Sequence, residues 1–145
     1  MGKPKVLFLC THNSARSQMA EAFLRKYAGD RFEVYSAGLH PTELHPLMKK
    51  VMKEMGFDMS GHHSKDLVQF LGATHFAYLI TVCGKADAEC PIFPGASIRL
   101  HWPFDDPSEF EGTEEEKLAK FRRVRDQIME KVRSWTKEVT SSDQT

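Results

Sequence analysis

The sequence predicts an α/β fold in three layers, with a central four-stranded parallel sheet and helices on both faces. Two patterns lead to this prediction. Short apolar runs of strand length alternate with segments of helical periodicity, which is typical of parallel sheets covered on both faces. The 145 residues contain no internal repeat and no linker-like stretch. We therefore expect a single domain over residues 1–140 and a frayed tail at 141–145.

The first half of the chain contains two predicted strands and two predicted helices. Residues 6–9 (VLFL) are fully apolar, as expected of a strand buried on both faces. Apolar side chains at spacings of three and four over residues 17–27 predict a helix. Alternation over residues 32–36 predicts the second strand, and residues 45–55 have the pattern of a second helix that Gly56 ends.

The second half continues the alternation. Residues 64–71 are expected to form a short helix capped by their first residue, a serine. Apolar runs at 76–82 and 98–101 predict the third and fourth strands. The sequence TEEE at 113–116 is a capping box with acids at the positive end of a helix, and it predicts a long helix ending near residue 139.

The composition argues against several classes of function. The 20 Lys and Arg residues balance 20 Asp and Glu residues, so the formal net charge is zero, unlike that of a typical nucleic-acid-binding protein. No stretch approaches the roughly 20 apolar residues that a membrane helix needs, and no signal-peptide core is recognised. Three cysteines cannot all pair with one another, which favours free thiols in a reducing compartment. We expect a cytoplasmic monomer.

The segment CTHNSARS, from Cys10 to Ser17, lies between the first strand and the first helix. Open α/β sheets bind ligands at the carboxyl ends of their strands, and a loop there directs backbone N–H groups and a helix N-terminus at one point. We expect Cys10 to ionise easily in this field and to act as a nucleophile, with Ser17 donating to the thiolate. The alternative is a buried structural cysteine beside a surface arginine. The predicted oxyanion-binding loop comprises Thr11, His12, Asn13, Ser14, Ala15, Arg16 and Ser17.

Four separate segments carry a resemblance to a known family. They are VLFLCTHNSARSQMAEAF at 6–23, VYSAGLHP at 34–41, TVCGKADAECP at 81–91 and HWPFDDP at 101–107. In this order they resemble the low-molecular-weight tyrosine phosphatase superfamily and, within it, the thioredoxin-coupled arsenate reductases. The resemblance implies the reduction of arsenate to arsenite, with phosphate and sulfate as competing anions and thioredoxin as a partner.

The other two cysteines, Cys83 and Cys90, lie at the end of the third predicted strand and in the loop beyond it. Reducing arsenate to arsenite takes two electrons, which a thiol pair supplies when it forms a disulfide. The resemblance implies a relay in which Cys10 attacks arsenate, Cys83 attacks Cys10, Cys90 attacks Cys83, and thioredoxin reduces the last disulfide. The alternative is that Cys83 is a buried strand residue and Cys90 an incidental loop thiol.

Displacing an oxygen from an oxyanion needs a proton donor. The resemblance assigns this role to Asp106 in preference to Asp105. An Asp-Pro pair also commonly opens a turn, and both interpretations can hold together. Asn13 has no such chemistry, but the loop lacks glycine and asparagine tolerates positive φ, so we expect Asn13 to hold the shape of the loop. His12 is expected to be an exposed loop residue.

Some family members bind potassium near the loop, through residues that align with Asn13, Glu21, Ser36 and a Thr-x-Asp segment. Here this last segment reads HHSKD at residues 62–66, with His63 in place of the threonine and Lys65 or Asp66 in place of the aspartate. A lysine is unfavourable in a cation site, so we expect no tightly bound cofactor and disfavour potassium. The seven histidines have no metal-ligand spacing, so no metal site is expected either.

Three functions remain open. The first is a thioredoxin-driven arsenate reductase, and the second is a protein tyrosine phosphatase that uses Cys10, Arg16 and Asp106. The third is a non-enzymatic oxyanion or redox sensor. Residues 108–110 (SEF) lack the adjacent aromatic pair that lines a phenol pocket in tyrosine-specific members, which weakens the second function, although weak phosphatase side activity would be unsurprising. The cysteine pair favours thioredoxin as the electron donor, with glutaredoxin or a small thiol as alternatives.

Overall fold

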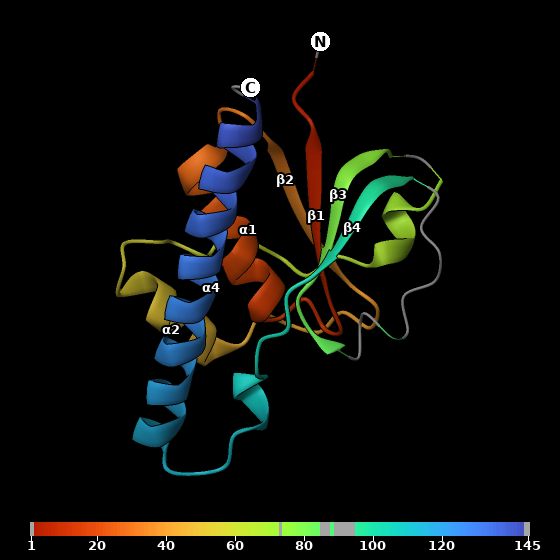
Figure 1. Cartoon of the computed structure of the whole chain (residues 1–145). Coiled ribbons are helices and arrows are strands. Elements are labelled where there is room, and N and C mark those ends of the chain that lie inside the picture. Colours follow the sequence, from red (N-terminus) through yellow and green to blue (C-terminus); the bar gives the residue numbers. More distant parts are fainter. Residues whose placement is uncertain (1, 73, 85–87, 89–94, 144–145) are drawn as a thin grey trace.

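The computed structural model describes residues 2–72, 74–84, 88 and 95–143, with side chains through residue 139. Its centre is a four-stranded parallel sheet in the order β2-β1-β3-β4 (Figure 1). The strands are β1 (Lys5–Cys10), β2 (Glu33–Gly38), β3 (Phe76–Thr81) and β4 (Ala96–His101). The predicted parallel sheet is confirmed. β4 begins two residues before the predicted start, because this edge strand is largely exposed and its first residues lack an apolar pattern.

The three described α-helices lie together on one face of the sheet (Figure 1). They are α1 (Arg16–Ala28), α2 (Pro46–Lys53) and α4 (Glu114–Asp143). On the other face the described structure contains the short 3-10 helix η1 (Leu67–Phe70), which packs through Phe70 against Tyr35 of β2. The predicted three-layer α/β class is confirmed, but the described helix of the second outer layer is a single 3-10 turn.

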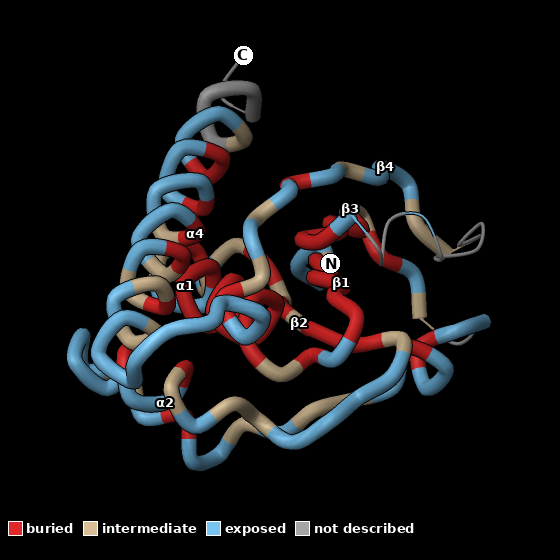
Figure 2. Tube along the Cα trace, turned by 90° about the horizontal axis from the view of Figure 1, so that it is seen from below, coloured by how far each residue is buried: buried red, intermediate tan, exposed pale blue. Residues whose placement is uncertain are grey.

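The core is continuous between the sheet and the helices, as the buried stretches in Figure 2 show. Every residue of β1 after Lys5 is buried, which confirms the predicted two-sided burial. On the helical face, the ring centroids of Phe8 and Trp102 are 5.8 Å apart. Those of Trp102 and Trp135, a residue of α4, are 5.7 Å apart. These contacts fix β1, and therefore the loop that follows it, against the longest helix.

All four predicted helices differ in extent from those observed. α1 is one residue longer at each end than predicted, and α2, predicted over residues 45–55, spans only Pro46–Lys53. The helix expected over residues 64–71 is only η1, and its cap is Asp66, whose carboxylate accepts from the Val68 amide at 2.9 Å, rather than Ser64. Ser64 lies three residues before the first residue of η1, and its hydroxyl is directed at the backbone oxygens of Asn13 and Thr42. The helix predicted to end near residue 139, before a tail from 141, continues to Asp143, since no glycine or proline interrupts it.

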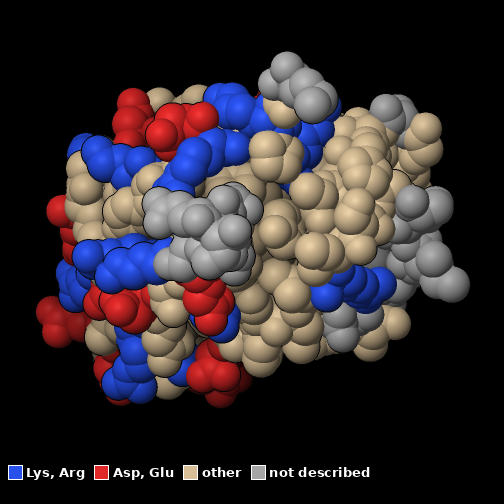
Figure 3. Space-filling model, turned by 45° about the horizontal axis from the view of Figure 1, so that its top comes forward, with Lys and Arg blue, Asp and Glu red and all other residues tan. Residues whose placement is uncertain are grey.

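The charged side chains are intermixed. On the face drawn in Figure 3, acidic and basic groups alternate over the side of the molecule that carries the helices. Among the described residues, no helix is long and apolar enough to cross a bilayer.

Candidate active site

The loop of residues 11–15 connects the last residue of β1, Cys10, to α1 at the carboxyl edge of the sheet (Figure 1). Its carbonyl oxygens point outward to the segment of residues 39–45. Four backbone amides of that segment donate to these oxygens: Leu39 to Cys10 (3.3 Å), His40 to Thr11 (2.8 Å), Thr42 to His12 (3.1 Å) and His45 to Ser14 (3.0 Å). In a trans peptide the C=O and N–H groups point in opposite directions, so the loop amides converge on the inner side. Converging amides at a helix N-terminus form an anion site.

Asn13 holds this loop in shape. Its φ of 52° is the only positive φ outside glycine among the described residues, which confirms the predicted conformation. The side chain is fully buried: Nδ2 donates to Ser17 Oγ at 2.8 Å, and Oδ1 accepts from Gln18 Nε2 at 3.0 Å and from the Lys65 amide at 2.9 Å. Asn13 therefore also ties the loop to α1 and to the segment before η1, which its local sequence does not reveal.

Gly38, the last residue of β2, allows the loop to approach the sheet closely. It pairs with Cys10 in the β1–β2 register. A Cβ atom on Gly38 would lie 2.9 Å from both the Asn13 nitrogen and the His12 carbonyl carbon, closer than atoms in contact can lie. A side chain here would therefore push the anion loop out of place. Gly38 was not among the predicted site residues, because its only signal in the sequence is a glycine that ends a strand.

The structure brings two of the three cysteines together. Cys10 and Cys83 are both buried free thiols, and Cys83 is the largest influence on the pKa of Cys10. The Thr11 hydroxyl lies 3.3 Å from Cys83 Sγ. The hydrogen bond with Cys83 and burial raise the pKa of Cys10, against the lowering effect of the Arg16 guanidinium. The expectation that Cys10 alone ionises easily is therefore wrong for this arrangement.

Arg16 lies at the start of α1 and is buried. Its Nη1 donates to the backbone oxygen of Phe104 at 3.0 Å, and its Nη2 lies 3.3 Å from Asp106 Oδ2. These contacts come from the HWPFDDP segment after β4, which fixes the guanidinium at the anion loop. The arginine and the aspartate that the sequence singled out are thus neighbours.

The two adjacent aspartates have different surroundings. Asp106 Oδ1 accepts from the amide and the hydroxyl of Ser108, at 3.0 and 2.6 Å, and so caps the 3-10 helix η2 (Pro107–Glu109). Its other oxygen faces Arg16, so the turn and the site contact predicted for this Asp-Pro pair occur together. The Asp105 side chain is 75% exposed and forms an ion pair with Lys120 at 3.0 Å.

Three further residues were predicted for the site: Ser17, His12 and Cys90. Ser17 Oγ accepts from Asn13, which leaves its own proton free for donation. His12 is exposed, as predicted, and its Nδ1 lies 3.0 Å from the oxygen of His40. Cys90 lies outside the described residues.

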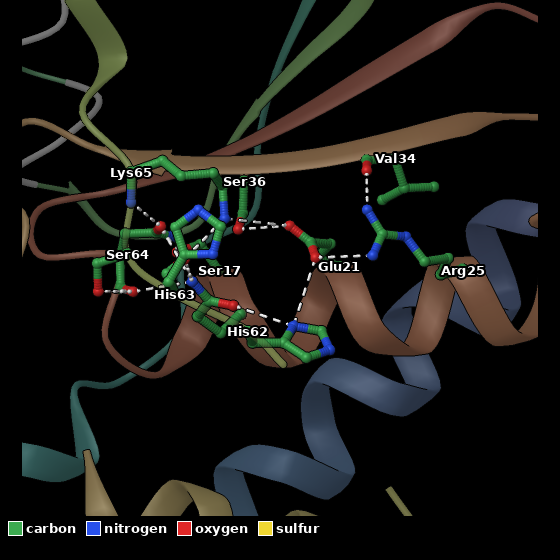
Figure 4. Close-up of polar contacts among 11 residues, drawn as sticks. Ser17, Glu21, Arg25, Val34, Ser36, His62, His63, Ser64 and Lys65 are labelled. Carbon is green, nitrogen blue, oxygen red and sulfur yellow. Dashed lines mark hydrogen bonds and ion pairs between the residues drawn. The ribbon is translucent and has the colours of Figure 1, made fainter. Parts of the chain in front are cut away.

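The residues aligned with potassium ligands form a cluster beside the loop (Figure 4). Ser36 Oγ donates to Glu21 Oε1 at 2.7 Å. Lys65 Nζ lies 3.8 Å from the same oxygen and donates to the His63 carbonyl at 2.8 Å. A potassium ion on these oxygens would lie against an ammonium group of like charge, so these residues do not fit potassium. Over the described part of the chain, no group of three or more His, Cys, Asp or Glu residues is arranged to hold a metal ion.

Proteins of known kind match this chain along most of its length. It is 46% identical over 135 residues to an arsenate reductase of Halalkalibacterium halodurans, covering 93% of this chain and 96% of that protein. It is 47% identical over 123 residues to an arsenate reductase of Bacillus subtilis, covering 85% and 88% of the two chains.

Solved structures give the same relationship. An arsenate reductase in the phosphate binding state superimposes with a TM-score of 0.77 at 32% identity, covering 93% of this chain and 98% of that chain. A thioredoxin-dependent arsenate reductase of Corynebacterium glutamicum, a longer protein, superimposes with a TM-score of 0.71 at 33% identity, covering 97% of this chain and 63% of that chain. The family of low molecular weight phosphotyrosine protein phosphatases matches residues 5–145. The chain therefore belongs to the low molecular weight phosphotyrosine protein phosphatase family.

Proposed function

We propose that this chain reduces arsenate to arsenite, using Cys10 and Cys83 as the two-electron donor. The observation that carries the proposal is a second buried free thiol beside the anion loop: Cys83 Sγ lies 3.3 Å from the Thr11 hydroxyl, next in sequence to Cys10, and interacts with the Cys10 thiol. Phosphate ester hydrolysis needs one nucleophile and no second thiol, whereas reduction of arsenate needs two thiols that can reach each other. The relatives named arsenate reductase support the same activity.

The proposed reaction balances in two steps. The Cys10 sulfur attacks the arsenic of bound arsenate, an As–O bond breaks, and the oxygen leaves as water. Cys83 then attacks the Cys10 sulfur and gives its proton to an oxygen of the departing arsenic group. A disulfide forms, and the electron pair of the S–As bond stays on arsenic, which becomes arsenite. Two thiols are oxidised for each arsenate reduced. Because the pKa of Cys10 is raised by its contact with Cys83, the bound oxyanion itself is the base that takes the Cys10 proton.

Arg16 and Asp106 have complementary roles in this scheme. The Arg16 guanidinium and the loop amides bind the oxyanion and stabilise the charge that develops on its oxygens. Asp106, held beside Arg16 by its contacts with Ser108, gives a proton to the leaving oxygen. Asp105 takes no part, because its carboxylate pairs with Lys120.

Regeneration completes the proposal. Cys90 attacks Cys83, which frees Cys10 and leaves a Cys83–Cys90 disulfide that thioredoxin reduces. The thioredoxin-dependent relative of Corynebacterium glutamicum supports this donor. The final thiol–disulfide exchange requires only that the outgoing disulfide be accessible to a partner thiol.

The test is NADPH oxidation in the presence of arsenate, thioredoxin and thioredoxin reductase. We expect steady turnover by the wild type, about one turnover by Cys90→Ser, and none by Cys83→Ser. Asp106→Asn should lower kcat, and Asp105→Asn is the matched control that should not. Replacing thioredoxin by glutaredoxin with glutathione, or by a small thiol alone, identifies the donor.

A phosphatase is the second candidate, because Cys10, Arg16 and Asp106 are also sufficient for hydrolysis. Rapid hydrolysis of p-nitrophenyl phosphate by wild type and Cys83→Ser alike, with no arsenate-dependent NADPH oxidation, would refute the reductase and leave the phosphatase. Anion binding and a reversible disulfide without turnover in either assay would leave a redox sensor.

A further inference from the structure

The cluster beside the anion loop contains a buried carboxylate that needs a cation. The Glu21 side chain is 4% exposed, and its Oε1 accepts a hydrogen bond from Ser36, which is itself fully buried. A carboxylate this deep in a protein is costly unless a positive charge lies beside it.

Three basic side chains surround Glu21, and they are not equivalent (Figure 4). Arg25 Nη1 lies 3.3 Å from Oε2, but this side chain is 53% exposed and is directed along α1 away from the loop. His62 Nδ1 lies 3.5 Å from the same oxygen, and burial lowers the pKa of His62, which favours its neutral form. Lys65 is 14% exposed and is the only one of the three that approaches Oε1, the oxygen shared with Ser36.

Lys65 is also connected directly to the anion loop. Its backbone amide donates to Asn13 Oδ1 at 2.9 Å, and its backbone oxygen accepts from the Gly38 amide at 2.8 Å. Its ammonium donates to the His63 oxygen, which also accepts from Gln18 Nε2 at 3.0 Å. Gln18 in turn donates to Asn13 Oδ1. The ammonium and the residue that shapes the loop therefore belong to one closed set of hydrogen bonds.

We propose that the ammonium group of Lys65 is the built-in cation of this cluster, and that it holds Asn13 and the anion loop in their binding geometry without a potassium ion. Lys65 is thus a positioning residue. The oxygens of Glu21 and His63, together with the Ser36 hydroxyl, are the ligand types that a monovalent metal cation prefers, but here they surround a covalently attached ammonium. The inference rests on the anion-binding role of the loop in the proposed function, and not on the redox steps.

The test measures thermal unfolding and phosphate affinity in buffers of equal ionic strength that contain potassium, methylammonium or tetramethylammonium chloride. The wild type should have the same Tm and phosphate Kd in all three. Lys65→Ala should lower Tm by about 5 °C in tetramethylammonium, because it removes the ammonium group that lies beside Glu21 Oε1. It should weaken phosphate binding roughly five-fold or more. Potassium or methylammonium, which can enter the space left by the side chain, should restore part of both losses.

Two controls separate this role from a general loss of structure. Lys50→Ala removes an exposed lysine of α2 and should change neither quantity. The double variant Lys65→Ala/Glu21→Gln removes both charges, so it should recover Tm relative to Lys65→Ala and lose the response to potassium. If Lys65→Ala does not fold, the cation response of the wild type and the double variant decide the question.

Two results would overturn the inference. The first is a wild type whose Tm or phosphate affinity rises with potassium over tetramethylammonium. The second is a Lys65→Ala variant that matches the wild type in tetramethylammonium. Failure of the wild type to bind phosphate would instead count against the proposed function, and the Tm measurements would still decide the role of Lys65.

Discussion

Asn13 offers the sharpest test of how the anion loop is built. In Asn13→Ala three side-chain hydrogen bonds are lost, to Ser17, Gln18 and the Lys65 amide. Each contributes about 1 kcal/mol. Asn13 itself carries a Cβ at a φ of 52°, so the backbone conformation adds little to the difference between Asn and Ala. Together the lost hydrogen bonds come to about 3 kcal/mol, a large share of the roughly 5–15 kcal/mol that stabilises an ordinary domain.

Two further substitutions separate backbone from side chain. Asn13→Gly tolerates the positive φ, so it should be about 1 kcal/mol more stable than Asn13→Ala and still lack the hydrogen bonds. Asn13→Asp keeps the shape of the side chain, and its carboxylate can accept from the same three partners. It also places a negative charge beside the converging amides. We therefore expect Asn13→Asp to fold but to bind phosphate at least about ten-fold more weakly.

The assays are urea unfolding for stability and calorimetric titration with phosphate for binding. Compared with the wild type, Asn13→Ala should lose mainly stability, whereas Asn13→Asp should lose mainly phosphate affinity. A loss of under about 1 kcal/mol in Asn13→Ala would refute the hydrogen-bond accounting. Wild-type phosphate affinity in Asn13→Asp would refute the assignment of the loop as the anion site.

Three further predictions concern other parts of the structure. Gly38→Ala would place a Cβ 2.9 Å from the Asn13 nitrogen. It should therefore lower the free energy of unfolding in urea by about 1–3 kcal/mol and weaken phosphate binding. Unchanged phosphate affinity would contradict the close approach. Hydrogen bonds from two arginines of α4 lower the pKa of Glu54 to about 2. The stability that Glu54 adds over Glu54→Gln should be complete above its ordinary pKa and disappear as the pH falls toward 2, whereas a pH-independent difference in Tm would contradict the pairing. Thr11→Val removes the hydroxyl beside Cys83. In single-turnover arsenate reduction it should slow the step in which the disulfide forms, while phosphate affinity stays within about two-fold. An unchanged rate would show that this contact is incidental.

The features predictable from the sequence are those with a local cause. The apolar run of β1 is buried on both faces because its composition allows nothing else. Asn13 adopts positive φ because it tolerates that conformation best among the residues of a loop without glycine. The position of the Asp106 carboxylate beside Arg16 results from a short turn that Asp106 itself caps soon after the end of a strand.

The features that could not be predicted depend on contacts between distant segments. Ser64 does not cap η1, because the helix begins only at Leu67 and the Ser64 hydroxyl is directed at the backbone oxygens of Asn13 and Thr42. The expected easy ionisation of Cys10 failed for the same kind of reason. Its immediate neighbours favour the thiolate, but the dominant influence is the thiol of Cys83, which follows the neighbouring strand β3.

The order of the strands explains why these two thiols meet. β1 lies directly beside β3, with Leu9 opposite Thr81, and the Val82 amide donates to the Leu9 oxygen at 2.9 Å. Neighbouring strands are about 4.8 Å apart, within the roughly 4.4–6.8 Å between Cα atoms that a disulfide requires. If another strand lay between β1 and β3, the separation would be roughly 10 Å, and no disulfide could form without moving the sheet. The redox chemistry proposed for Cys10 and Cys83 thus depends on the order β2-β1-β3-β4, which no local sequence pattern specifies.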